Sequence, residues 1–444
     1  MKPRPSPVTQ AQQVGFLLPE LATQLDARQP LYRLALALDW KYFVKAFGAL
    51  YSDEGRPALP IRRMVGLLLL KYLKNLSDEA VVEFWSLSPY AQFFYGEREL
   101  QWGLPCEPCE LTHFRNRIGP EGGEKLLQAS ITLHGEGAKE KKVVVDTTTQ
   151  EKNITYPTDT KLAAKIVRTG VKIAHREGLV LRQSFARTVP KLLCAQRGRR
   201  TQTGALRARK AARRLKTIAG QVVRQLDRSL PEGSPRRHWL ETGQKVLAQK
   251  KKDSHKIYSL HEPPVYCLSK GKEHKKYEFG AKASLVVGKT GGVILGAYSL
   301  MENDYDGHTV GPALDQVQRL AGHRPQVAIG DRGYKGKSQW DGTTLLIPGV
   351  PKKTDSAYTR RKARVRFRRR AAIEPRIGHL KSDFRLGRNF LKGPQGDSMK
   401  LLLAATASNL SLWMRKLLSA LFTLLRFCLH FSRSSPQPQF KISF

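Results

Sequence analysis

"KVVVDTT", residues 142–148, sets three valines and two threonines around Asp146. β-Branched side chains favour strands, and an apolar run this short is typical of a buried strand rather than of an isolated helix. The stretch therefore predicts that a sheet begins here. Asp146 would stand at the end of its first strand.

The residues before this strand have a helical pattern. "LYRLALALDWKYFVKAFGALY" (31–51) and "IRRMVGLLLLKYL" (61–73) place apolar residues three and four positions apart, as amphipathic helices do. We expect residues 31–140 to form a helical, DNA-binding N-terminal domain. Residues 1–30 are rich in Pro and Gln and are expected to be irregular.

The residues after the strand form a basic segment with helical spacing. Residues 156–270 carry 27 Lys and Arg against 7 Asp and Glu, which is a net charge of +20, half of the +40 of the whole chain. A chain with this excess repels itself unless a polyanion is near, so nucleic acid is the expected partner. We interpret the segment as a helical insert that interrupts the sheet and helps to hold DNA.

Strand signals resume beyond the insert. "EFGAKASLVVG" (278–288) and "GGVILGAYSL" (291–300) flank a turn and predict an antiparallel hairpin. A helix over 309–322 and strands over 326–331 and 343–349 follow. The expected fold class is α/β, a mixed sheet built from residues 141–155 and 271–400 with helices packed on it. Residues 401–444 would add a C-terminal helix and tail.

Three carboxylates occupy special places in this interpretation. Asp146 and Asp331 each end a strand, and Glu374 stands among arginines in "RRRAAIEPRIGHLKSDFRLGRN" (368–389). This segment is expected to be a helix that tolerates Pro375 in its first turn. On one helix, Arg370 and Lys381 would lie on the same side as Glu374. If the two strands are neighbours, the aspartates lie side by side, and like charges so close need a proton or a metal between them. Mg²⁺ prefers such oxygen ligands, and two ions can activate a water or a 3′-hydroxyl at phosphorus. Each residue alone could equally be a turn, cap or ion-pair residue.

The segment "RAAIEPRIGHLK" resembles the Tyr-x2-Arg-x3-Glu-x6-Lys motif of bacterial insertion-sequence DDE transposases. Arg370, Glu374 and Lys381 match its Arg, Glu and Lys, whereas Phe367 stands in place of Tyr. "VVVDTTTQEKNITYPTDTKL" and "AIGDRGYKGK" are similar to the family's first and second aspartate segments. The resemblance covers most of residues 31–410 and points to the insertion-sequence four/five superfamily.

The resemblance implies a ribonuclease-H-like core in which Asp146, Asp331 and Glu374 are the catalytic metal ligands. It implies two ions of Mg²⁺ or Mn²⁺, cleavage at terminal inverted repeats, and transfer of the 3′-hydroxyl ends to target DNA. The partners would be double-stranded DNA and further copies of the chain. The expected DNA contacts are Arg370, Lys381, Arg369, Arg376, Arg385 and Lys335.

Several alternatives remain open from the sequence. A metal-dependent nuclease without strand transfer, or a catalytically inactive DNA-binding remnant, would share these motifs. "LTHFRNRIGPEGGEKLLQ" (111–128) could be a helix-turn-helix that begins at Thr112 or an ordinary helix pair. A zinc site could include Cys106, Cys109 and His113, but such a site needs four ligands, and no second Cys-x-x-Cys follows.

Composition suggests where the protein works. Five cysteines and a start without a secretory pattern favour reduced thiols and a cytoplasmic, nucleoid-associated protein. The apolar stretch 401–431 contains Arg415, Lys416 and Arg426. These charges favour a packing helix over a membrane span.

Overall fold

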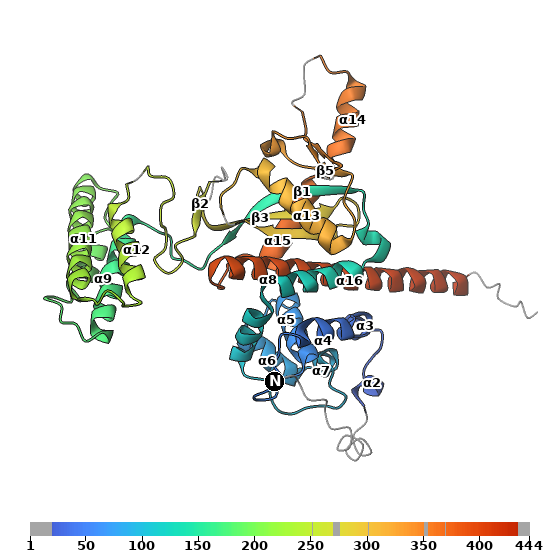
Figure 1. Ribbon diagram of the computed structural model, residues 1–444. Helices are drawn as coiled ribbons and strands as arrows, with labels where there is room; N and C mark the ends of the chain where they lie inside the picture. The colour runs from blue at the N-terminus through green and yellow to red at the C-terminus, as the bar shows by residue number, and fades with distance from the viewer. Residues whose placement is uncertain are drawn as a thin grey trace, which may run out of the picture.

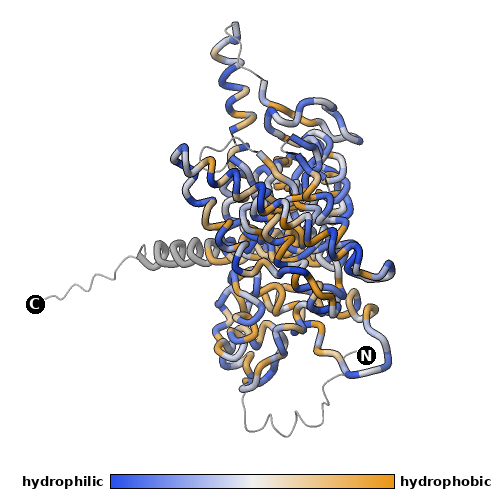
Figure 2. The backbone as a smooth tube through the Cα atoms, turned by 90° about the vertical axis from the view of Figure 1, so that its left-hand side faces the viewer, coloured by the Kyte–Doolittle hydropathy of each residue, from blue (hydrophilic) through white to orange (hydrophobic). Residues whose placement is uncertain are grey.

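The computed structural model describes residues 20–250, 252–269, 276–300, 302–349, 354–368 and 370–433. A mixed sheet lies on one side of a long C-terminal helix, α16 (Gly393–Arg433), and a group of N-terminal helices lies on the other (Figure 1). A helical lobe stands beside the β2 end of the sheet. Apolar residues gather where sheet, α16 and N-terminal helices meet (Figure 2).

The sheet is organised around β1 (Lys142–Glu151), which extends the predicted valine run. Asp146 lies in the middle of this strand, so the prediction that it ends the strand is wrong: β1 continues to pair with β3 as far as Glu151. β1 pairs antiparallel with β3 (Glu278–Gly288), from Val143 opposite Gly288 to Glu151 opposite Gly280. On its other side it pairs in parallel with β5 (Val327–Ile329). The strand order is β2-β3-β1-β5-β7-β6, and β4 also pairs with β3. The remaining strands are β2 (Tyr266–Leu268), β4 (Ile294–Ser299), β6 (Gln339–Trp340) and β7 (Thr343–Leu346).

Gly280 marks the tightest point of the sheet, since it pairs with both Glu151 of β1 and Tyr266 of β2. A Cβ at this position would lie 1.9 Å from the Gln150 carbonyl oxygen. Any side chain here would therefore force the strands apart. The predicted hairpin of β3 and β4 is confirmed.

The N-terminal helices pack on α16 through one continuous core that also includes the sheet. α8 contains a kink at Gly119 (φ 55°, ψ −173°), followed by Pro120. Two helical segments therefore meet at Gly119 and Pro120, as a helix pair over 111–128 requires, but a single non-helical residue separates them rather than the three- to four-residue turn of a helix-turn-helix. The expected cap at Thr112 is wrong, because Glu107 is the N-cap. These helices are α2 (Leu21–Gln24), α3 (Pro30–Ala37), α4 (Trp40–Gly48), α5 (Ile61–Leu73), α6 (Asp78–Leu87), α7 (Pro89–Tyr95), α8 (Pro108–Thr132) and η1 (Gly135–Ala138).

The helices between β1 and β2 form a lobe with a hydrophobic core of its own. They are α9 (Asp159–Arg176), α10 (Thr188–Cys194), α11 (Gln202–Ser229) and α12 (Arg237–Ala248). Leu215, Ile218 and Leu226 of α11 are completely buried in this core. The sequence predicts that the insert extends to residue 270, but β2 already belongs to the sheet.

The remaining helices surround the sheet. α13 (Val310–Ala321) follows the 3-10 turn η2 (Asp306–Thr309), and η3 (Arg332–Tyr334) follows β5. α14 (Ala357–Phe367) projects from the sheet (Figure 1), and a 3-10 turn, η4 (Arg370–Ala372), precedes α15 (Ile373–Ser382). Pro375 lies in the first turn of α15, as predicted. The C-terminal helix begins at Gly393 instead of 401. No helix of the described residues is long and apolar enough to cross a membrane.

The separate core of the lobe gives a test. Leu215→Ala removes a fully buried side chain, and we expect it to lower the free energy of unfolding of the lobe by about 2–5 kcal/mol. Leu206→Ala, on the same helix but 54% exposed, should cost less than about 0.5 kcal/mol. Hydrogen exchange of α9–α12 amides measures both; equal protection in the two variants would contradict a separate core.

Candidate active site

The first two predicted carboxylates meet at one edge of the sheet. Val144 of β1 lies opposite Ile329 of the parallel strand β5. Asp146 and Asp331 each come two residues further along, and the backbone at Asp331 is still extended (φ −87°, ψ −174°). Adjacent strands lie about 4.8 Å apart, so the shared register brings the two aspartates to the same level. The predicted neighbourhood of their strands is confirmed.

Backbone amides fix both carboxylates locally. The Asp146 carboxylate accepts the Thr147 N–H at 2.8 Å, and the Asp331 carboxylate accepts the Gly333 N–H at 2.7 Å. Asp331 thereby caps η3. The cap role and a ligand role are compatible, because each carboxylate has further lone pairs.

The pKa of the buried Tyr334 hydroxyl reflects the charges at this edge of the sheet. Burial raises the pKa of its hydroxyl well above the usual value, and the charges of Asp146, Asp306 and Asp331 raise this pKa further. Three carboxylates therefore act on one buried phenol. A region of such negative potential inside a chain of net charge +40 attracts a cation.

Asp306 is the acidic residue that sequence reasoning missed. It begins η2, where its carboxylate pairs with Lys282 of β3 at 2.6 Å and accepts the Thr147 hydroxyl at 2.9 Å. Lys282 is 7% exposed, so Asp306 neutralises a buried cation. The stretch "NDYDGHTVGP" (303–312) contains this acid. The sequence alone does not show which residues Asp306 contacts, because Lys282 and Thr147 come from two other strands.

Glu374 lies on the exposed side of α15, which packs against β1. Its side chain is 63% exposed and pairs with Arg370 at 3.7 Å. Arg370 belongs to η4, so the prediction of one helix through both residues is wrong. Among the described residues, no three His, Cys, Asp or Glu side chains are grouped so that they could hold a metal ion. The donor chemistry at the sheet edge, carboxylate oxygens without sulfur or imidazole, is that of Mg²⁺ or Mn²⁺.

The predicted DNA contacts divide into two groups. Lys335 is exposed at the sheet edge, and Arg370 and Lys381 lie at the two ends of the Glu374 segment. Arg376 instead points into the protein, because its guanidinium contacts Ser408 of α16 and burial lowers its pKa. Arg385 donates to the Asn75 carbonyl at 3.0 Å. Arg369 lies outside the described residues.

A buried ion cluster fixes the segment between α15 and α16. Lys152, just after β1, pairs with Asp397 at 2.9 Å and with Glu262 at 3.4 Å. Lys152 and Asn389 also pair as an isolated bridge between the two segments. The cluster joins the end of β1, the end of the insert and the start of α16. It therefore holds the segment that follows α15 against the end of β1.

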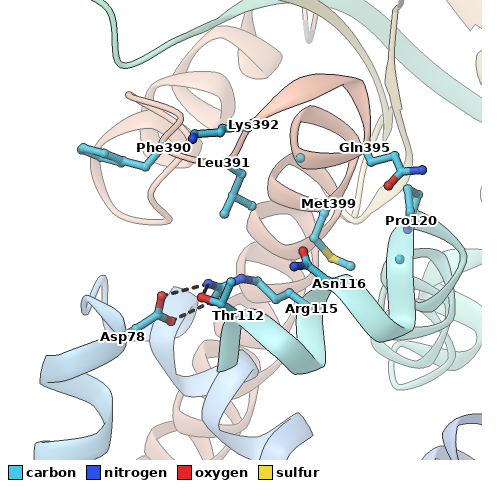
Figure 3. A pocket seen from close by; sticks show the side chains of 12 residues that line it. Asp78, Thr112, Arg115, Asn116, Pro120, Phe390, Leu391, Lys392, Gln395 and Met399 are labelled. Atoms are coloured by element: carbon cyan, nitrogen blue, oxygen red, sulfur yellow. Dashed lines mark hydrogen bonds and ion pairs between the residues drawn. The ribbon is translucent and has the colours of Figure 1, made fainter. Parts of the chain in front are cut away.

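A pocket of about 510 Å³ lies where α6 and α8 face the start of α16 (Figure 3). Asp78 at its wall accepts two hydrogen bonds from Arg115, at 2.7 and 2.9 Å, and one from Lys71 at 2.6 Å. Burial works to raise the pKa of Asp78, but these cations lower it overall. None of the three predicted catalytic carboxylates lines this pocket. The pocket lies between the N-terminal helices and the start of α16, and it is separate from the sheet edge.

Neighbouring aspartates on or just after parallel strands, in a mixed sheet of a strongly basic chain, are typical of enzymes that transfer nucleic-acid phosphoryl groups. Residues 19–117 match a transposase domain (DUF772), and residues 248–410 match a transposase DDE domain. The chain is 44% identical over 170 residues to the uncharacterised protein ORF8 in the nfe locus of Rhizobium meliloti, a match that covers 37% of this chain and 81% of that protein. No solved structure matches the chain. The chain belongs to the insertion-sequence DDE transposases.

The matched ranges leave out β1 and Asp146. The structure nevertheless places β1 between β3 and β5, which both belong to the range 248–410 matched by the DDE domain. The insert of α9–α12 thus separates β1 in sequence from β3 and β5, the strands with which it pairs in space.

Burial of Lys400 on α16 gives a pH test. Burial, with Arg385, Lys71 and Lys152 nearby, lowers its pKa to about 7. The unfolded chain keeps the proton to about pH 10.4, so wild-type stability is lower below pH 7 and rises between pH 7 and 10. We expect Lys400→Met to remove up to about 1.4 kcal/mol of this rise per pH unit.

Urea unfolding at several pH values measures the effect. Lys392→Met, at an exposed lysine nearby, serves as the control and should follow the wild-type pH dependence. A constant difference between Lys400→Met and wild type from pH 6 to 9 would show that Lys400 is not the group responsible.

Proposed function

We propose that this transposase cuts DNA strands at the terminal inverted repeats of its element and joins the freed 3′-hydroxyl ends to target DNA. Asp146, Asp331 and Glu374 would be the catalytic residues and metal ligands. The observation that carries the proposal is the parallel register of β1 and β5, which brings Asp146 and Asp331 together. Glu374 lies on α15, a helix that packs against β1, which supports its assignment as the third acid of the family motif.

Bound Mg²⁺ or Mn²⁺ would supply activation of the attacking oxygen and stabilisation of the leaving oxygen. The chain's own residues prepare this site. Hydrogen bonds from the Thr147 and Gly333 amides hold the aspartates in fixed orientations. The Lys282–Asp306 pair anchors η2 beside them, so that the carboxylates need little reorganisation when the substrate arrives.

Glu374 and Arg370 would respond to DNA together. In the free protein they pair with each other at 3.7 Å on an exposed surface, where such a pair contributes at most about 1 kcal/mol. A DNA phosphate can also bind a guanidinium through two parallel hydrogen bonds. We propose that a phosphate takes Arg370 and frees the Glu374 carboxylate for the metal, while Lys381 and Lys335 hold flanking phosphates. Two copies of the chain would bring the two element ends together.

Glu374→Gln tests the third ligand. The amide keeps the shape of the side chain but loses its charge, and we expect cleavage of an end-containing duplex in Mg²⁺ to fall by at least about 10³-fold. Binding of the same duplex in EDTA should stay within about threefold of wild type, because Glu374 donates nothing to phosphates. Gel assays of nicking and fluorescence anisotropy measure the two quantities.

Asp383→Asn is the matched control. This carboxylate is exposed at the end of the same helix and pairs with His379 at 2.7 Å, so its loss should leave cleavage unchanged. Cleavage by Glu374→Gln at the wild-type rate would overturn the ligand assignment. A wild-type protein that nicks the duplex but joins no precut ends to a plasmid would be a nuclease, and one that does neither would be a DNA-binding remnant.

A further inference from the structure

The helical lobe carries a long stretch of chain with positive charges only. Residues 178–226 contain thirteen Lys and Arg and no Asp or Glu, and all thirteen side chains are exposed. No ion pair among the described residues engages any of them. An ordinary solvated helix face mixes both signs of charge. This surface therefore repels itself and favours an anionic partner.

α11 arranges part of this charge along one face. Its buried residues, among them Leu215, Val222 and Leu226, occupy one half of the helix. The opposite half carries Lys210, Arg213, Arg214, Arg224 and Arg228, here called the α11 stripe. From Lys210 to Arg228 the helix rises about 27 Å, at 1.5 Å per residue. This length corresponds to roughly eight base pairs of DNA, whose phosphates provide one charge per 1.7 Å of axis.

A groove of about 560 Å³ continues the stripe between α11 and the α9–α10 connection. Its wall contains three arginines, Arg182, Arg224 and Arg228, together with Gln221, Gln225 and Ser229, and no carboxylate. Guanidinium, amide and hydroxyl groups are the side chains that bind DNA phosphates. Asp227, the nearest acid on α11, is paired with Arg237 at 3.1 Å. The groove is therefore built to receive an anion.

The lobe also stands apart from the catalytic edge. It has its own core, and α11 stands on the side of the lobe away from the sheet (Figure 1). Residues 178–226 lie outside both ranges that match transposase families. Neither the N-terminal match nor the DDE match therefore assigns this surface a role.

We propose that the α11 stripe and its groove bind the backbone of a DNA duplex outside the cleavage site, without reading its sequence. The choice of DNA rests on the transposase function proposed above. The surface offers charged groups spaced along a rigid helix and few apolar side chains, which suits phosphate contacts rather than an acidic protein surface. A second DNA contact away from Asp146 and Asp331 would hold DNA that flanks an element end, or target DNA. The proposed cleavage and strand transfer would meanwhile take place at the sheet edge.

The test uses the full chain, because the stripe lies on exposed positions and its substitution should not disturb folding. Lys210→Gln, Arg213→Gln, Arg224→Gln and Arg228→Gln are combined in one variant. Binding of a labelled random-sequence duplex of roughly 30 base pairs is measured by anisotropy in EDTA over a range of NaCl concentrations. We expect the slope of log affinity against log salt to become shallower by about 0.9 for each phosphate that the variant no longer neutralises, up to about 3–4 in total.

The control removes the same charge from the same lobe but not from α11. It combines Lys172→Gln, Arg176→Gln, Lys245→Gln and Lys250→Gln, all at exposed positions, and its slope should change by less than about one. An equal change in both variants would mean that net charge alone acts, and no change in either would mean that DNA binds elsewhere. Both results would overturn the proposal. Because no metal is present, neither depends on the catalytic assignment.

Discussion

The position of β1 between β3 and β5 is the constraint on which the rest of the structure depends. β1 has partners on both edges, antiparallel on one side and parallel on the other, so its register fixes two neighbours at once. A shift by one residue would turn Asp146 to the opposite face. About a hundred residues of insert follow β1, and the chain then returns to the same sheet at β2. The ion pairs of Lys152 with Asp397 and Glu262 link the point where the chain leaves the sheet to the end of the insert and the start of α16.

Electrostatics divides the molecule into regions with different tasks. The chain has a net charge of +40, yet the carboxylates that act on Tyr334 gather at one sheet edge. A group of carboxylates within a basic surface suits an enzyme that must bind a phosphodiester and a metal cation at the same place. The cations of α11 lie elsewhere on the surface, where a long polyanion could engage several of them together.

The sequence predicts what depends on local pattern and on pairs of neighbouring strands. The valine run of β1, the hairpin of β3 and β4, and Pro375 in the first turn of α15 follow from β-propensity, turn residues and helix-start rules. The three local features need no knowledge of distant contacts. The meeting of Asp146 and Asp331, in contrast, follows only once their two distant strands are paired.

Contacts between distant segments could not be predicted in this way. Arg376 and Arg385 look like phosphate-binding residues in a basic stretch, but the structure turns them toward α16 and Asn75. Asp306 gains its importance only from Lys282 and Thr147 on other strands. Ile373, the first residue of α15, is buried in the core, and the 3-10 turn η4 before it separates Arg370 from the helix of Glu374.

The central claim is that Asp146, Asp331 and Glu374 share a divalent cation. Replacing Mg²⁺ by Fe²⁺ in the DNA complex, with ascorbate and peroxide, generates hydroxyl radicals at the metal and cuts the backbone beside it. We expect three fragment pairs, from cuts near residues 146, 331 and 374, all suppressed by excess Mg²⁺. Cuts that cluster elsewhere, or cuts at the two aspartates without one near Glu374, would contradict the claim.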